Sequence, residues 1–334
     1  RKHAQMLADA GVDAIFFDVT NGFHYLTVVK KLCEVYTQMR AEGSKTPQFA
    51  FLMNGSTADV MNAVYNEIYK TGKWKDLWYE WLGKPLVLAN PNSIQASYKD
   101  KFTFRHSWFL WNIPSADTWF GNGEDKWPWG GHYPQQVGMH GGKAEMTYVL
   151  PATHANTNIG RSYDALGGGE PAVPNPGKGI FFKQMMDRAM TIDPQMLFFT
   201  GWNEWTAQKQ YSANGGEGFL GKICKPGDWY FVDQYNHEFS RDLEPLNGDF
   251  GDNYYYMLVD YVRKFKGTQK LPTFTETDNI SVDGSFDDWK DVKALYADYK
   301  GDVTHRNHYG WGRVGTDTNK TGRNDIVLSK VAND

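Results

Sequence analysis

The chain has 334 residues, of which 41% are hydrophobic, and a formal net charge of −4. This length suffices for one large domain of roughly 250 residues and part of another. Lysine and arginine residues are mixed with acidic ones, so the sequence offers no basic stripe for nucleic acid and no polybasic membrane patch. All apolar runs are shorter than the ~20 residues that span a bilayer, which argues against membrane insertion.

Helical and strand patterns alternate along the first 267 residues. Apolar residues at helical spacing predict helices over residues 2–10, 24–43, 56–70, 178–193 and 251–267. Gly11 ends the first helix, and Ser56 or Thr57 is the expected N-cap of the third. Apolar runs predict strands over residues 12–18, 48–54, 84–90, 101–111, 144–152 and 195–205. Since the sequence starts at Arg1 in a helical pattern and without Met, we expect the natural N-terminus to be missing.

Most of these predicted strands are continuous apolar runs between helices, which is typical of buried strands in a parallel sheet. No GxGxxG motif or P-loop follows any of them, so an open nucleotide-binding sheet is disfavoured. We therefore expect an α/β protein with a TIM-type (β/α)8 barrel over residues 1–266 that lacks its N-terminal strand or strands. A linker is expected over residues 267–278, and residues 279–334 read as the start of an all-β domain that stops before its sheet is complete.

Polar residues follow the predicted strands at the places where such a barrel carries its chemistry, the carboxyl ends of the strands. They are Asp18, Asn21, Asn54, Asn90, His106, Trp108, Asn203 and Glu204. Because these ends meet at one rim of a barrel, we expect the side chains to converge on one cleft.

The stretch "FFTGWNEW" places Glu204 between Trp202 and Trp205. Partial desolvation there raises the pKa of a carboxylic acid towards the range useful for proton donation. Asp18 is the candidate second carboxylate, and glycosidic cleavage needs two, about 5 Å apart for retention or roughly 6.5–9.5 Å for inversion. The alternatives are a Glu204 that accepts backbone N–H groups and an Asp18 that caps its own turn.

The polar loop over residues 232–245 supplies two more candidate catalytic carboxylates, Glu238 and Asp242; the alternative is a structural network with Arg241. His106 is a base, a sugar contact or a buried histidine with its bonds satisfied. The predicted substrate-binding residues are Asn21, Asn54, His106, Trp108, Trp202, Asn203, Trp205, Gln208 and Arg241. The loop over residues 119–133 carries Trp119, Trp127 and Trp129, which suit stacking on sugar rings or, alternatively, a packed plug.

Several other chemistries lack their motifs in this sequence. A GxSxG elbow is absent, and neither Cys33 nor Cys224 lies in a polar cluster, so serine and cysteine nucleophiles are disfavoured. Histidines are scattered and HExxH does not occur, so no catalytic metal and no organic cofactor are expected. Asp283, Asp287 and Asp288 are possible ligands of a structural calcium ion, although turn-forming aspartates are the simpler interpretation.

"FFTGWNEW", "SRDLEP" and "GDNYYYMLVDYVRKFKG" together resemble the barrel's end in bacterial proteins of the glycoside hydrolase family 71 and 99-like group. "ADAGVDAIFFDVTNG" is similar to their early strand. The resemblance implies a (β/α)8 barrel, secretion and cleavage of α-linked glycans, with Asn203, Glu204 and Trp205 matching the Asn-Glu-Trp of endo-α-mannosidases. Those enzymes carry a second Glu three residues after the first, where this sequence has Ala207. "SVDGSFDDW" resembles the start of family 9-type carbohydrate-binding modules, which often hold calcium.

Together these features predict a secreted, periplasmic or cell-surface glycoside hydrolase that acts on a poly- or oligosaccharide through Glu204 and Asp18 or a carboxylate of the 232–245 loop. The alternative is an inactive barrel that binds glycans in a secreted or surface protein, and Ala207 favours it. A polysaccharide lyase is a third possibility, but the base beside a uronate-neutralising cation that it needs is not found. Sugar, linkage and oligomeric state are left open by the sequence.

Overall fold

A computed structural model describes residues 1–109, 125–153, 159–204, 209–216, 218–219, 222–231, 236–248, 250–267, 280–297, 300, 306–309 and 316–332. Within these residues, five strands pair in parallel in the order β1-β2-β4-β5-β6. Their bounds are Ala14–Val19, Gln48–Met53, Lys84–Leu88, Thr103–Phe109 and Lys126–Gly130. The short β3 (Glu80–Trp81) pairs antiparallel with β4.

A second sheet contains β7 (Val137–His140), β8 (Lys143–Val149) and β9 (Met196–Phe199). β7 is antiparallel to β8, whereas β9 runs parallel to it. The Thr200 hydroxyl, just after β9, donates to the carbonyl of Trp129 near the end of β6. The carboxyl ends of β6 and β9 are therefore neighbours, although no ladder joins the two sheets in the part of the chain that the structure describes.

The expected TIM-type barrel is wrong. The described strands form a half-barrel of five parallel strands and a separate three-stranded sheet, and among them β1 pairs only with β2 and β9 only with β8. The α/β class and the parallel pairing are confirmed. Apolar runs between helices are expected for any parallel sheet that is covered on both faces, whether the sheet is open or closed into a barrel. The sequence pattern therefore does not indicate whether the sheet closes.

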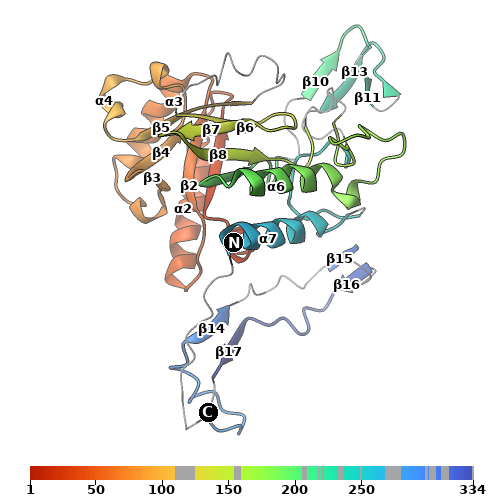
Figure 1. The fold of residues 1–334 in the computed structure, drawn as a ribbon. Helices are drawn as coiled ribbons and strands as arrows, with labels where there is room; N and C mark the ends of the chain where they lie inside the picture. Colours follow the sequence, from red (N-terminus) through yellow and green to blue (C-terminus); the bar gives the residue numbers. More distant parts are fainter. Residues whose placement is uncertain are drawn as a thin grey trace.

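The helices that connect the strands pack on the outer side of the sheets (Figure 1). Their bounds are α1 (Lys2–Asp9), α2 (Leu26–Ala41), α3 (Thr57–Val64), α4 (Ala96–Lys99), α6 (Ile180–Ile192) and α7 (Asn253–Lys266). Gly11 follows α1 with φ +80°, as expected of a helix stop. Ser56, one of the two predicted residues, is the N-cap of α3, although its side chain makes no capping hydrogen bond and the Thr57 hydroxyl donates to the Asn54 carbonyl. None of the described helices combines the length and the apolar character needed to cross a membrane.

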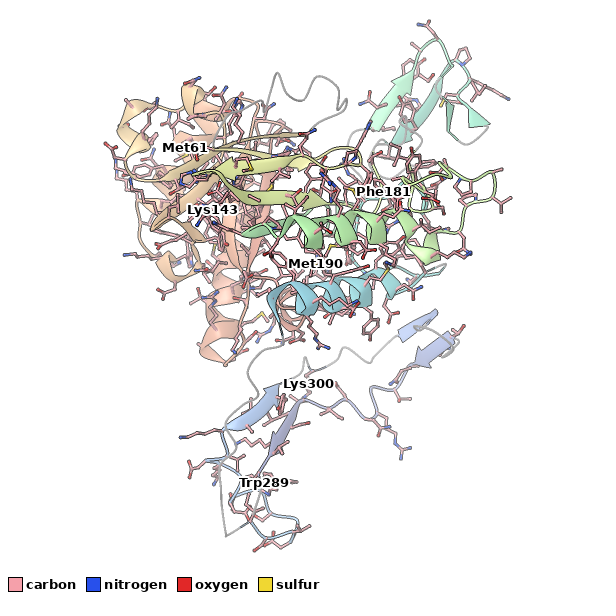
Figure 2. The ribbon with its side chains drawn as sticks, viewed as in Figure 1. Met61, Lys143, Phe181, Met190, Trp289 and Lys300 are labelled. Atoms are coloured by element: carbon pink, nitrogen blue, oxygen red, sulfur yellow. The ribbon has the colours of Figure 1, made fainter. Side chains whose placement is uncertain are left out.

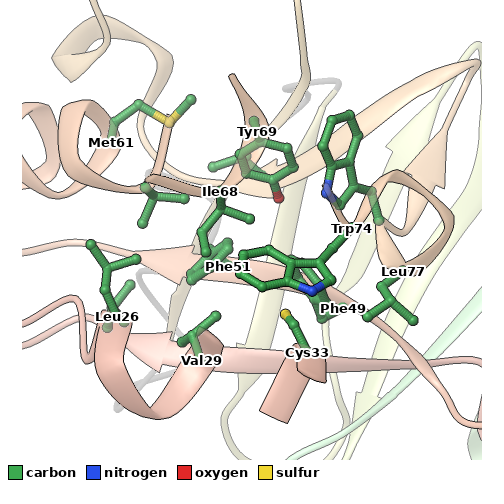
Figure 3. Close-up of a cluster of buried hydrophobic side chains, with 14 of the residues drawn as sticks. Leu26, Val29, Cys33, Phe49, Phe51, Met61, Ile68, Tyr69, Trp74 and Leu77 are labelled. Carbon is green, nitrogen blue, oxygen red and sulfur yellow. The ribbon is translucent and has the colours of Figure 1, made fainter. Parts of the chain in front are cut away.

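One hydrophobic core lies between α2, α3 and β2. Figure 3 shows Leu26, Val29 and Cys33 of α2 directed towards Phe49 and Phe51 of β2. Cys33 is fully buried, and burial raises the pKa of its thiol to about 12, which disfavours the reactive thiolate.

A second core lies between α6, α7 and the sheets. α6 and α7 run side by side in Figure 1. The Phe182 ring of α6 contacts Tyr254 and Tyr261 of α7. Figure 2 shows Phe181 and Met190 near the two ends of α6, so this helix packs along most of its length.

Residues 280–332 contain two small antiparallel sheets, β14–β17 and β15–β16, which lie outside the main body in Figure 1. Their bounds are Ala294–Ala297 with Leu328–Val331, and Arg306–Tyr309 with Thr316–Asn319. Short strands and turns were expected here. The predicted linker over 267–278 lies, apart from Gly267, outside the described residues.

Candidate functional site

A pocket of about 1120 Å³ lies between β1 and β9. It is lined by β1, β9 and residues of α1, α2 and α7, and most of the lining side chains are apolar. Polar residues line it at both ends of the two strands, with Asp13, Gln195 and Lys266 at their amino ends. We call the part at their carboxyl ends the mouth, formed by Asp18, Asn21, Tyr25, Trp202, Asn203, Glu204 and Arg241.

The mouth brings together most of the residues that the sequence analysis selected at the ends of two strands. Asp18 and Asn21 come from β1, and Trp202, Asn203 and Glu204 follow β9. Arg241, from the predicted 232–245 loop, joins them. The convergence expected at the carboxyl ends of parallel strands is therefore observed for β1 and β9.

Gly201 allows the chain after β9 to turn into the mouth. Its φ is +99°, and a Cβ atom there would lie 2.4 Å from the Arg241 carbonyl oxygen. The chain beyond it pairs with the segment after Arg241: Leu243 N–H donates to the Gly201 carbonyl at 3.3 Å and Glu244 N–H to the Trp202 carbonyl at 3.0 Å. Only glycine permits this approach, which fixes Glu204 relative to Arg241.

Glu204 is held by its backbone and complemented by a guanidinium. Its N–H donates to Asp242 Oδ1 at 2.7 Å, and its carboxylate lies 3.8 Å from Arg241 Nη2. The Arg241 side chain is 6% exposed, whereas that of Glu204 is 47% exposed. The desolvation predicted for Glu204 is thus not observed, and the buried cation favours its charged form.

Asp18 and Asn21 shape the turn that follows β1. Asp18 Oδ1 accepts the N–H of Thr20 at 2.9 Å, the turn-capping contact that the sequence analysis gave as the alternative. Asn21 accepts the N–H of Phe23 and donates to the hydroxyl of Tyr25 at 2.8 Å. The Asp18 side chain is nevertheless exposed in the mouth and has a second oxygen for a ligand.

The Trp202 indole forms a half-buried wall of the mouth. Its ring contacts His3 and Tyr255 edge-on, with centroids 5.9 and 6.4 Å away. Its buried Nε1 has no hydrogen-bond partner among the residues that the structure describes. The Asn203 amide nitrogen lies 3.4 Å from Nδ1 of His3, and Nε2 of that histidine lies 2.8 Å from Glu244. His3 of α1 therefore contacts both Trp202 and Asn203.

The other candidate carboxylates are buried beside the mouth rather than in it. Glu238, which is 4% exposed, accepts the N–H of Ser162 at 2.5 Å and its hydroxyl at 2.8 Å. Asp242 is 1% exposed and holds the Glu204 N–H. Neither lines the pocket, and the contacts of both are structural, but the carboxylate that pairs with Arg241 is Glu204 rather than Glu238 or Asp242.

Glu170 lies against Glu238 at the loop that follows β8. Glu170 Oε2 accepts the N–H of Gly160 at 2.7 Å, and a Cβ atom on that glycine would meet Glu238 Oε1. Burial, together with the charge of Glu238, raises the pKa of Glu170 to about 7, although the Gly160 N–H acts against the rise. Arg161, fully buried, donates to the Asp242 carbonyl at 2.6 Å and so ties this carboxyl pair to the segment behind Glu204.

Several predicted residues do not reach the mouth. Asn54 follows β2 but does not line the pocket, and the same holds for His106 of β5, whose pKa is lowered by burial and by Lys126. The side chain of Trp108 and all of Trp205 and Gln208 lie outside the described residues, as do Ala207 and Trp119.

Of the loop tryptophans, Trp127 is fully buried and belongs to the core, so stacking of sugars on it is excluded. Trp129 lines the pocket, as predicted for a sugar platform. Tyr25 was not selected from the sequence, although a phenol four residues after Asn21, at the start of the helix predicted over 24–43, is a signal that was available.

A buried charge cluster in the sheet was also missed. Glu145 of β8 accepts both Nε and Nη2 of Arg105, at 2.7 and 2.6 Å, and the indole N–H groups of Trp81 and Trp127. Burial opposes ionisation, but these bonds outweigh it and lower the pKa of Glu145. A glutamate within the apolar run 144–152 was the available signal.

The described residues offer no convincing metal site. Ligand atoms of Asp125, His140 and Glu145 lie within 4.8 Å of one another. The Arg105 guanidinium already compensates the negative charge of the two carboxylates, because it lies 3.2 Å from Asp125 and 2.6 Å from Glu145.

One of the three aspartates considered for calcium caps a turn: Asp283 accepts the N–H of Ser285, two residues further along the chain. Asp288 accepts the N–H of Ser281, seven residues earlier, and Asp287 pairs with Lys290. The turn-forming interpretation thus matches the contact of Asp283.

Neither models of protein families nor curated proteins match this chain. The resemblance to glycoside hydrolases stays a prediction, and the function is argued below from the mouth itself.

Proposed function

We propose that the mouth binds a carbohydrate and that Asp18 and Glu204 act together on one of its glycosidic bonds. The observation that carries this proposal is the convergence of two acidic side chains, from the ends of β1 and β9, on one pocket that Trp202 and Trp129 also line. Glycosidases act through such carboxyl pairs, and clefts with aromatic walls and few polar groups are the usual small-molecule sites.

The contacts of the two carboxylates suggest their roles. Arg241 complements a negatively charged Glu204, which suits a nucleophile or a base that activates water. Asp18, which is also exposed, would then carry the proton for the leaving oxygen. Asn21, Asn203 and Tyr25 supply hydrogen-bonding groups for sugar hydroxyls.

Glycan binding without cleavage is the second candidate function. It is favoured by the hydrogen bond from the Thr20 N–H to Asp18, because this turn-capping contact gives the residue a structural role that needs no catalysis. Secretion and family membership follow only from the sequence resemblance and stay predictions, as does a structural calcium ion.

Release of reducing ends from a panel of α- and β-linked glycans tests the proposal. We expect turnover by the wild-type protein and a loss of at least about a hundredfold in kcat for Glu204→Gln and for Asp18→Asn, because each removes a charge that the reaction uses. Glu80→Gln and Asp100→Asn, at exposed positions outside the pocket, are the matched controls and should retain full activity. Binding that survives in both mouth variants, without any turnover by the wild type, would establish the second candidate instead.

A further inference from the structure

The hairpin of β10 (Lys209–Ser212) and β13 (Asp228–Phe231) stands out from the main body in Figure 1. Its strands pair antiparallel, with Lys209 opposite Phe231 and Tyr211 opposite Trp229. Directly opposite residues share a face of a two-stranded sheet. One face therefore carries all four of these side chains, which we call the aromatic face.

The aromatic face is the solvent-exposed side of this two-stranded sheet, so its rings do not belong to a hydrophobic core. Tyr211, Trp229 and Phe231 are 53%, 58% and 37% exposed, whereas Ser212 on the opposite face is fully buried. Burial of apolar surface would drive the alternation the other way, with aromatic residues inside and serine outside. Exposed aromatic residues gathered in this way indicate an interaction surface.

The rings of the aromatic face form a small, continuous platform. The centroids of Tyr211 and Trp229 lie 4.7 Å apart with the planes tilted by 44°. The ammonium of Lys209 lies 4.5 Å from the Trp229 ring centroid. A pyranose has an apolar face of C–H groups and a rim of hydroxyls, so it matches rings that stack and a neighbouring amine that donates.

The size of the aromatic face argues against a protein partner. A stable protein interface needs about 800 Å² from each side, whereas a fully covered aromatic side chain supplies only ~150–250 Å² and these are already half covered. Nucleic acid is disfavoured because the chain has a net charge of −4 and no basic stripe. A chain of sugar units fits a platform of two or three rings.

The hairpin is joined at both ends to the segments that build the mouth. β10 begins five residues after Glu204, and β13 ends five residues before Asn236, which leads into Arg241. We propose that the aromatic face is a second glycan-binding site, at which a polysaccharide held in the mouth continues onto Tyr211 and Trp229. This inference rests on the proposed function for the identity of the ligand, and it names that ligand as a polymer rather than a short oligosaccharide.

Native gels that contain starch, β-glucan, galactomannan, α-mannan or xylan test this site. We expect at least one polymer to retard the full chain, and Tyr211→Ala and Trp229→Ala each to weaken that retardation about three- to tenfold. Trp229→Phe should retain most of it because a ring remains. Tyr256→Ala, an exposed tyrosine of α7, is the control and should bind as the wild type does.

The outcomes separate this inference from the proposed hydrolysis. Polymer binding that depends on Tyr211 and Trp229 without release of reducing ends would support the aromatic face and overturn the hydrolysis. Retardation of the wild type that is unchanged in both alanine variants, or no retardation by any of the five polymers, would overturn the aromatic face. Melting temperatures equal to that of the wild type confirm that the variants fold, as expected for exposed side chains.

Discussion

Glu145 shows how one buried charge can hold several strands. Its carboxylate binds Arg105 of β5, Trp81 of β3 and Trp127 of β6. We predict that Glu145→Gln lowers the free energy of unfolding by about 3–5 kcal/mol, because it leaves the Arg105 guanidinium buried without its counter-charge. Denaturant unfolding followed by circular dichroism measures the change. The exposed Glu80→Gln should shift it by less than about 0.5 kcal/mol, and equal shifts in the two variants would contradict the importance of the cluster.

Glu170 gives the stability a dependence on pH near neutrality. Because its pKa is raised to about 7, the folded protein keeps a proton that the unfolded chain releases above its ordinary, lower value. The protonated Glu170 carboxyl therefore stabilises the folded protein at low pH, and this stabilisation is lost as the pH rises towards and through about 7. We predict a melting temperature that falls between pH 5 and pH 8, and a smaller fall in Glu170→Gln, which still accepts the N–H of Gly160. His106 and His132, whose pKa values are lowered by burial, are present in both proteins and cancel in the comparison. Parallel curves would contradict the assignment.

At the scale of elements, the junction between β9 and the mouth depends on Gly201. Gly201 and Gly43 have nearly equal φ, +99° and +97°, but only Gly201 has backbone where a Cβ atom would lie. We predict that Gly43→Ala costs about 1 kcal/mol, from backbone strain alone, and that Gly201→Ala costs clearly more because it also pushes the Arg241 segment away. Equal costs in thermal unfolding would show that the close approach does not matter.

The sequence predicted the major elements well. Five helices and six strands occur where apolar spacing placed them, since this spacing reports directly on the buried face. β6 and β7 were missed because "KWPWG" and "VGMH" are short and rich in glycine and proline. The mouth was predicted in part: strand ends brought together Asp18 and Glu204, but Asn54 and His106 do not line the pocket, and His106 lies within β5 rather than at its end.

At the scale of the molecule, sheet closure was not predictable from the sequence. The sequence of an apolar strand is the same whether or not both of its edges pair with other strands. β1 and β9 are end strands of their sheets, and their sequences do not indicate this. The half-buried apolar residues of these two strands line the pocket, and the polar residues at and after their carboxyl ends form the mouth. The function proposed here thus depends on two strands that are far apart in the sequence.

A crystal structure of Glu204→Gln with an oligosaccharide bound would decide whether the mouth is a hydrolytic site, since this variant should keep the ligand intact. We expect a sugar ring against Trp202, with a glycosidic oxygen within about 3.2 Å of a carboxyl oxygen of Asp18 and residue 204 on the other side of the scissile bond. An oligosaccharide bound elsewhere, or one in the mouth whose glycosidic oxygens approach neither side chain, would contradict it.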